Sequence, residues 1–156
     1  MAGLRNIQIQ IETDSNGTIA AEIEAQLVKA LRQNVPPNDS EPLILVARDE
    51  TDLVGGLIGS TSYGWLLVKI LWVAEEVRRR GLGTSLMAQA EALARAKGCH
   101  SAWLDTSAAD AERFYIRLGY KRFGVLENTS GELPRGHRRA FLAKRFARAP
   151  SEPKDG

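Results

Sequence analysis

The sequence predicts one three-layer domain of the α/β (α+β) class, built on a mixed and mostly antiparallel sheet. The length of 156 residues suits one domain of common size. The spacing of apolar residues changes along the chain between the two-residue period of strands and the longer period of helices. Over residues 66–104 a strand, a helix and a strand follow one another, which implies a parallel crossover within the sheet. We expect the domain to span residues 1–146 and residues 147–156 to form a disordered tail.

The N-terminal part predicts a strand followed by a helix. Isoleucine alternates with polar residues over 7–11, as in a strand with one buried face. Over residues 19–31 apolar residues recur every four positions, which predicts an amphipathic helix with Thr18 as its cap. The prolines within residues 35–39 then end this helix.

The remaining elements read as a sheet interrupted by two helices. Gly98 and Gly119 follow the two helical patterns, where a C-terminal glycine belongs. The expected order is a strand over 43–47, a turn at 49–52, a strand over 53–62, a turn at Tyr63 and Gly64, a central strand over 66–73, a helix after Gly83, a strand over 101–105, a helix over 109–118, and closing strands over 120–126 and 138–146.

Composition excludes several classes of function. The net charge is only +2 and aromatic residues make up 6%, which gives little support to a nucleic-acid partner. Cys99 is the single cysteine, and the two histidines, His100 and His137, are far apart, so neither a disulfide nor a metal site is expected. The N-terminus lacks an apolar signal core, and no run approaches the roughly 18 apolar residues of a membrane span. We therefore expect a cytoplasmic protein without a membrane partner.

A basic, glycine-containing loop joins the central strand to the next helix. It reads Arg78-Arg79-Arg80-Gly81-Leu82-Gly83-Thr84. Main-chain N–H groups of a first helical turn lack partners and attract phosphate, while glycines let oxygen atoms approach the backbone. A tight turn that merely permits packing is the alternative. The spacing excludes the triphosphate P-loop, and Leu86 occupies the third glycine position of a dinucleotide fingerprint.

The loop resembles the acetyl-CoA motif Arg-x-x-Gly-x-Gly of the GNAT superfamily of N-acetyltransferases. The later segment Ala111-Glu112-Arg113-Phe114-Tyr115-Ile116-Arg117-Leu118-Gly119-Tyr120 resembles the Ala-x-x-Phe-Tyr-x-x-Leu-Gly-Phe/Tyr signature of the same family. Finding both motifs in order, separated by a helix and a strand, favours the resemblance over simple packing of an aromatic pair. The family often has Asn where this chain has Ala108, which removes one expected hydrogen bond to the cofactor.

The resemblance implies a sheet that splays between its fourth and fifth strands, residues 66–73 and 101–105, with acetyl-CoA as co-substrate. It also implies transfer of the acetyl group to a primary amine by direct attack in a ternary complex. The cofactor-binding residues carried over are Leu71, Trp72, Val73, Arg78, Arg79, Arg80, Gly81, Leu82, Gly83, Thr84, Ala111, Phe114 and Tyr115.

Three chemical roles remain to be filled for such a transfer. Asp105 is the first candidate for the general base, because it ends a parallel strand where open α/β sheets bind ligands. A turn-capping role for Asp105 stays open, as do base roles for Glu75, Glu76 and His137. By the resemblance, Tyr115 protonates the leaving thiolate and a main-chain N–H near Trp72 or Val73 meets the oxyanion.

The sequence leaves the acceptor amine open among an antibiotic, a polyamine, an amino acid and a protein amine. Residues 36–41 and 128–137 are expected to wall the acceptor site, and their carboxylates, Glu132 among them, would attract a cation. A homodimer paired through the closing strands is compatible with the pattern. A non-catalytic acyl-CoA-binding or interaction module with the same fold is the alternative function.

Overall fold

The computed structural model describes residues 7–31 and 40–147. The chain divides into two compact units, residues 1–37 and 38–156, and each is described by itself. Residues 35–39, expected to end the first helix, and residues 148–156 of the expected tail lie outside the described residues. The single domain over residues 1–146 therefore stays a prediction. Over the described ranges, every helix is too short or too polar to cross a membrane.

The first unit contains helix α1 (Thr18–Leu31) and corrects two predictions. Residues 7–14 form no strand; a strand needs a neighbour for its backbone hydrogen bonds, and the described part of the first unit contains no second strand. Thr18 is itself helical, so it is not the cap. The carboxylate of Asp14 caps the helix instead, since the main-chain N–H of Ala20 donates to its Oδ2 at 2.8 Å. The same hydrogen bond lowers the pKa of Asp14.

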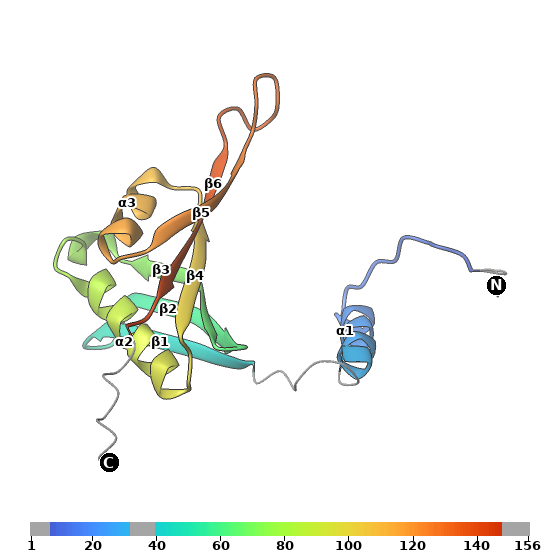
Figure 1. The fold of residues 1–156 in the computed structure, drawn as a ribbon, viewed down its shortest axis with the longest axis horizontal. Helices are drawn as coiled ribbons and strands as arrows, with labels where there is room; N and C mark the ends of the chain where they lie inside the picture. Colours follow the sequence, from blue (N-terminus) through green and yellow to red (C-terminus); the bar gives the residue numbers. More distant parts are fainter. Residues whose placement is uncertain (1–6, 32–39, 148–156) are drawn as a thin grey trace, which may run out of the picture. The chain divides into compact units, whose positions relative to one another are not determined.

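The second unit is built on a six-stranded sheet in the order β1-β2-β3-β4-β6-β5. Its strands are β1 (Glu41–Asp49), β2 (Asp52–Ser62), β3 (Trp65–Val73), β4 (Ser101–Thr106), β5 (Lys121–Glu127) and β6 (Arg138–Arg145). β3 and β4 are parallel, and the other four pairings are antiparallel. The α/β class, the mixed sheet and the parallel crossover are thereby confirmed (Figure 1).

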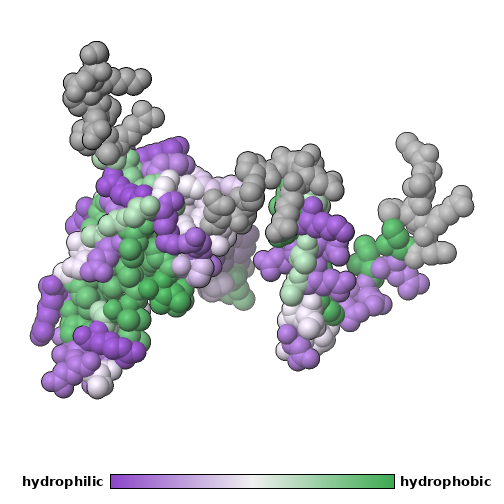
Figure 2. Space-filling view, turned by 90° about the horizontal axis from the view of Figure 1, so that it is seen from below, coloured by the Kyte–Doolittle hydropathy of each residue, from purple (hydrophilic) through white to green (hydrophobic). Residues whose placement is uncertain are grey.

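Two helices, α2 (Leu82–Ala96) and α3 (Ala109–Arg117), pack on one face of this sheet. Leucines of neighbouring strands, at most 1% exposed, form the centre of the core with Met87 and Ala90 of α2 and Tyr115 of α3; they are Leu57, Leu66, Leu104 and Leu142. Residues that alternate with them face the other way. Of these, Ile44, Val46, Ile58, Ile70 and Trp72 are exposed. Figure 2 shows hydrophobic residues gathered on one side of the second unit.

β3 and β4 diverge after a short paired segment. Trp65–Val68 pairs with Ser101–Leu104, and residues 69–73 of β3 continue without pairing to β4. A register shift between β2 and β3 leaves Lys69 as an extra residue directly after the last parallel pair. Such a β-bulge bends and twists its strand, which explains why the two strands separate here. The predicted splay is confirmed, although these strands are the third and fourth because residues 7–11 form none.

Gly59 makes the bulge sterically feasible. A Cβ atom at this position would lie 2.5 Å from the main-chain oxygen of Leu67. We expect Gly59→Ala to lower the free energy of unfolding by about 1–3 kcal/mol, the usual range for overpacking. Gly124→Ala in β5 is the matched control, because the nearest atoms to its Cβ would be 3.9 Å away. Urea unfolding of both variants checks this, and equal losses would contradict a special role for Gly59.

Candidate active site

The open edge of β3, residues 69–73, exposes main-chain groups beside the diverging β4. The N–H of Ala74 donates to the carbonyl of Val54 at 2.8 Å, so Ala74 faces β2. The main-chain groups of successive strand residues point to opposite edges of the strand. Those of Trp72 therefore also point toward β2, whereas those of Leu71 and Val73 point toward the open edge. The carbonyl of Val73 accepts a hydrogen bond from Nε of Arg78 at 3.0 Å. Of the two main-chain donors expected here, the N–H of Val73 is therefore the one directed toward the opening.

The loop before α2 has the backbone geometry of an anion site. Arg79 has φ +62° and Gly81 has φ +82°, both in the left-handed region. Alternation of left-handed residues turns consecutive N–H groups toward one concavity. The first helical bond runs from Ser85 N–H to Gly81 O at 2.9 Å, and no side chain caps the helix. The N–H groups of residues 82–84 are thus left for a ligand at the positive end of the helix dipole.

The two glycines of the loop serve different purposes. A Cβ on Gly81 would meet nothing within 4 Å, so glycine is needed there for its left-handed backbone. A Cβ on Gly83 would lie 3.4 Å from the Phe114 ring and 3.7 Å from Cγ2 of Val73. Gly83 therefore lies close to both β3 and α3, with room there for little more than a methyl group. This closeness brings the two sequence motifs together and refines the expectation that both glycines only clear space for phosphate.

Tyr115 lies on α3 directly after Phe114. Its ring meets those of Phe114 and Tyr120 edge to face, with centroids 5.2 and 5.9 Å away, and the residue is 8% exposed. Burial raises the pKa of Tyr115, so its hydroxyl is protonated at neutral pH. The described residues give this hydroxyl no hydrogen-bond partner, and no fully enclosed side-chain oxygen among them lacks one. The Tyr115 hydroxyl therefore reaches the surface. Ala111, one turn earlier, packs on the core.

Asp105 follows Leu104 on β4 and projects from the sheet face opposite to α3. Its Oδ2 lies 3.2 Å from Nε of Arg139, and its side chain is 35% exposed. The turn after β4 is bonded by Thr106 and not by Asp105, since Oγ1 of Thr106 accepts a hydrogen bond from the N–H of Ala108 at 3.2 Å. Asp105 and Tyr115 thus occupy opposite faces of the sheet near the end of β4.

The other candidate bases lie in different settings. Glu75 and Glu76 are exposed on a short 3₁₀ turn, η1 (Glu75–Val77), directly after β3. His137 is half-buried at the end of the β5–β6 connection, and its main-chain carbonyl accepts a hydrogen bond from Asn128 N–H at 2.9 Å. None of the hydrogen bonds or ion pairs of the described residues joins these three side chains to Tyr115.

A buried carboxylate, Glu112, was not singled out by the sequence reasoning. It is 5% exposed, and with Tyr115 it is one of the two buried residues of α3. Its carboxylate binds Arg122 of β5 and, at 2.6 Å, Nη1 of Arg138 of β6. The hydrogen bond from Arg138, followed by that from Arg122, holds the pKa of Glu112 below its usual range although burial acts the other way. The sequence did contain a signal for Glu112, because a position three residues before Tyr115 falls on the same helix face.

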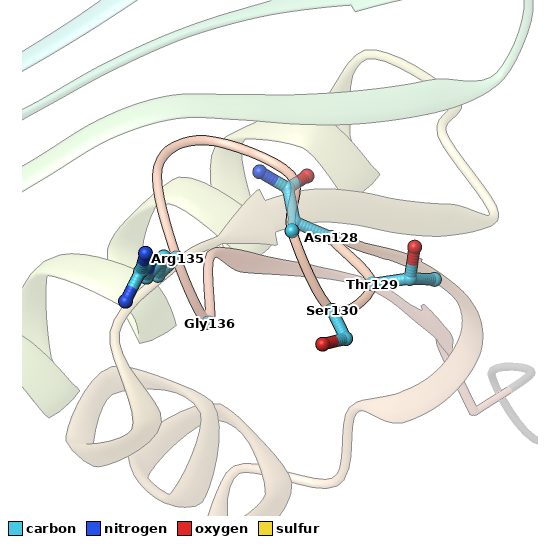
Figure 3. Close-up of a pocket in the computed structure, with 6 residues that line it drawn as sticks. Asn128, Thr129, Ser130, Arg135 and Gly136 are labelled. Atoms are coloured by element: carbon cyan, nitrogen blue, oxygen red, sulfur yellow. The ribbon is translucent and has the colours of Figure 1, made fainter.

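The connection between β5 and β6, residues 128–137, borders an open hollow of about 490 Å³ (Figure 3). It is lined by Asn128, Thr129, Ser130, Gly131, Arg135 and Gly136. The Asn128 amide donates to the carbonyl of Pro134 at 2.9 Å and the Thr129 N–H donates to Glu132 at 2.6 Å. Glu132, expected to attract a cation, thus bonds the loop itself. In the other predicted wall, residues 36–39 lie outside the described residues.

Comparison with known proteins identifies the relatives of this chain. Residues 8–120 match the family model described as the acetyltransferase (GNAT) family. An acetyltransferase of Agrobacterium fabrum is 41% identical over 103 residues, which cover 66% of this chain and 72% of that protein. A blasticidin-S acetyltransferase of Streptomyces morookaense is 38% identical over 99 residues, covering 60% of this chain and 72% of that protein.

Solved structures share the same fold. An acetyltransferase from Agrobacterium tumefaciens superposes with a TM-score of 0.80 at 33% identity, over 90% of this chain and all of that one. A streptothricin acetyltransferase from Bacillus anthracis, solved in complex with acetyl coenzyme A, has a TM-score of 0.61 at 19% identity, over 71% of this chain and 64% of that one. At that identity the second structure shows a common fold.

The Glu112 cluster makes stability depend on pH in a defined direction. A carboxyl whose folded pKa lies below its unfolded value of about 4.3 stabilises the fold above that pH and loses this contribution as the pH falls. We expect Glu112→Gln to lower the free energy of unfolding at pH 7 by about 1–3 kcal/mol. The difference from wild type should shrink at pH 3. Urea unfolding at both pH values checks this, and a difference that is unchanged or larger at pH 3 would refute it.

Proposed function

The chain belongs to the acetyltransferase (GNAT) family, and on that premise we propose that it transfers an acetyl group from acetyl-CoA to a primary amine by direct attack in a ternary complex. The observation that carries this proposal is the closeness of Gly83 to Phe114 and Val73. It supports a single site formed by the anion-binding loop, the open edge of β3 and the helix of Tyr115.

The residues of the site suit the two parts of acetyl-CoA. The N–H groups of residues 82–84 would hold the pyrophosphate, with the exposed side chains of Arg79 and Arg80 adding charge contacts. Arg78 already bonds the carbonyl of Val73, which favours a role in shaping the loop. The pantetheine arm would lie along the open edge of β3, where unpaired main-chain groups can bond its amides. Phe114 and Ala111 would pack against this arm.

Three groups of the chain would then act on the reacting atoms: the N–H of Val73, the hydroxyl of Tyr115 and the carboxylate of Asp105. Acetyl-CoA, once bound, supplies a thioester carbon that bonds the amine nitrogen while the C–S bond breaks and its electron pair leaves on sulfur. The N–H of Val73 would donate to the carbonyl oxygen as negative charge develops there. Tyr115, protonated at neutral pH, would give its proton to the sulfur.

The amine must lose a proton before or during the attack. An alkylamine with a pKa of about 10.4 costs about 4.6 kcal/mol to present neutral at pH 7. We assign Asp105 as the base that accepts this proton. Its place on the sheet face opposite to α3 supports an approach of the amine from that side, while the cofactor binds on the side of α2.

The acceptor class is narrowed by one relative. Blasticidin-S acetyltransferase, 38% identical, is named for blasticidin S. Blasticidin S is therefore the acceptor with which an assay of this chain should begin, followed by other amine-bearing antibiotics, polyamines, amino acids and peptide amines.

Release of free thiol from acetyl-CoA, followed over this acceptor panel, tests the proposed function. Tyr115→Phe should lower kcat by about 100-fold or more, because the sulfur loses its proton donor. The KM for acetyl-CoA should change by less than about two-fold, since the loop before α2 is untouched. Full turnover by Tyr115→Phe would remove the acid role. If wild type binds acetyl-CoA but acetylates no member of the panel, the chain is a binding module.

The pH–rate profile distinguishes a base from an ion-pair partner at Asp105. Asp105→Asn should flatten the rise of kcat/KM with pH, because the proton acceptor is lost. Arg139→Gln breaks the same ion pair but keeps the carboxylate, so its profile should keep the rise. If Asp105→Asn keeps the wild-type rise, or both variants flatten it equally, Asp105 is not the base.

A further inference from the structure

The Glu112 carboxylate joins three elements around the site. It lies on α3, while Arg122 lies on β5 and Arg138 is the first residue of β6, directly after the connection 128–137. Two guanidinium groups bond its two separate oxygens. The described hydrogen bonds and ion pairs include no other side chain that links a helix to two strands of the β5–β6 hairpin.

Glu112 and Tyr115 are coupled through the helix that carries both. They are three residues apart, so they lie one turn from each other on the same side of α3. No side chain caps this short helix, whose N-cap is Ala108. A shift or rotation of α3 would therefore move the Tyr115 hydroxyl, and the bonds to Arg122 and Arg138 oppose such a movement.

Stability alone does not account well for an ion cluster of this kind. Removing a carboxylate from water carries a penalty that the attraction to its partners often only balances, and apolar residues of similar volume can stabilise as much. The side chains of Arg122 and Arg138 remain 47% and 32% exposed, so solvent weakens their attraction further. The cluster instead fixes the orientation of the Glu112 side chain, because each of its two oxygens is bonded by an arginine from a different strand.

We propose that Glu112 is a positioning residue, whose bonds to Arg122 and Arg138 set the place of the Tyr115 hydroxyl relative to the β5–β6 hairpin. This inference rests on the proposed function, in which Tyr115 protonates the leaving sulfur. Glu112 itself touches no reacting atom in this scheme and acts through Tyr115.

A double-mutant cycle on turnover tests the inference. Glu112→Gln should lower kcat by about 10- to 100-fold, the effect of misplacing a catalytic group by about 1 Å, with the KM for acetyl-CoA within about two-fold of wild type. The double variant Glu112→Gln, Tyr115→Phe should be no slower than Tyr115→Phe alone, within about two-fold. Losses that multiply would overturn the inference.

Glu91→Gln is the matched control. If Glu112→Gln fails to fold, Arg138→Gln takes its place as the test variant. Glu91 accepts hydrogen bonds from Tyr120 and Lys144 at 3.0 and 2.8 Å, so it is also a bonded, poorly exposed carboxylate, but it lies on α2. We expect Glu91→Gln to lower stability while changing kcat by less than about three-fold. We expect Arg138→Gln to lower kcat in the same direction as Glu112→Gln. An equal loss of kcat in Glu91→Gln, or none in Arg138→Gln, would contradict positioning.

A spectroscopic readout keeps this test independent of the acceptor. The chain has three tyrosines, so 3-fluorotyrosine labelling yields three fluorine resonances, and the Tyr115 signal is the one lost in Tyr115→Phe. Glu112→Gln should shift or broaden the Tyr115 signal and leave that of Tyr63 unchanged. If wild type acetylates no amine, the proposed function fails, and this signal still decides the inference: an unmoved Tyr115 resonance overturns it.

Discussion

The parallel pairing of β3 with β4 extends only from Trp65 and Ser101 to Val68 and Leu104, and the geometry of the site depends on this limit. Beyond it, the main-chain groups of Leu71 and Val73 have no strand to bond on that side. The bulge at Lys69 bends β3 where the pairing stops, and Gly59 allows the close approach that the bulge requires. A continuous pairing would satisfy these groups internally and close the sheet to a ligand.

The remaining parts of the site are arranged around this open edge. The crossover from β3 to β4 places the N-terminus of α2 beside it, and two left-handed residues, Arg79 and Gly81, turn free N–H groups outward. Phe114 lies close to Gly83, so α3 is near the same edge. Ionic contacts then hold the start of β6 from both sides, because Arg138 bonds Glu112 on one face and Arg139 bonds Asp105 on the other.

Local sequence patterns predict much of this structure. The elements from β1 to β6 fall within a few residues of their expected places, since apolar period and glycine punctuation act over short distances. The prediction of a strand at residues 7–11 is wrong, because an alternating sequence pattern does not ensure that a neighbouring strand is available for pairing. The cap of α1 is Asp14 instead of Thr18, a choice that depends on where the first helical turn closes.

The site was predictable only where its residues lie in contiguous motifs. The loop 78–84 and the segment 111–120 are such motifs, and they come together where Gly83 lies close to Phe114. The cluster of Glu112, Arg122 and Arg138 joins residues up to 26 positions apart, and no local pattern pairs them. The pairing of Asp105 with Arg139 likewise depends on the register of β4 against β6.

Amide hydrogen exchange with and without acetyl-CoA tests most directly whether the open edge of β3 and the start of α2 form one cofactor site. Added acetyl-CoA should slow exchange at the N–H of Val73 and at the N–H groups of residues 82–84 together, because each gains an acceptor. The N–H of Trp72, which faces β2, should change little. Protection confined to other parts of the chain, or none at saturating acetyl-CoA, would contradict this account.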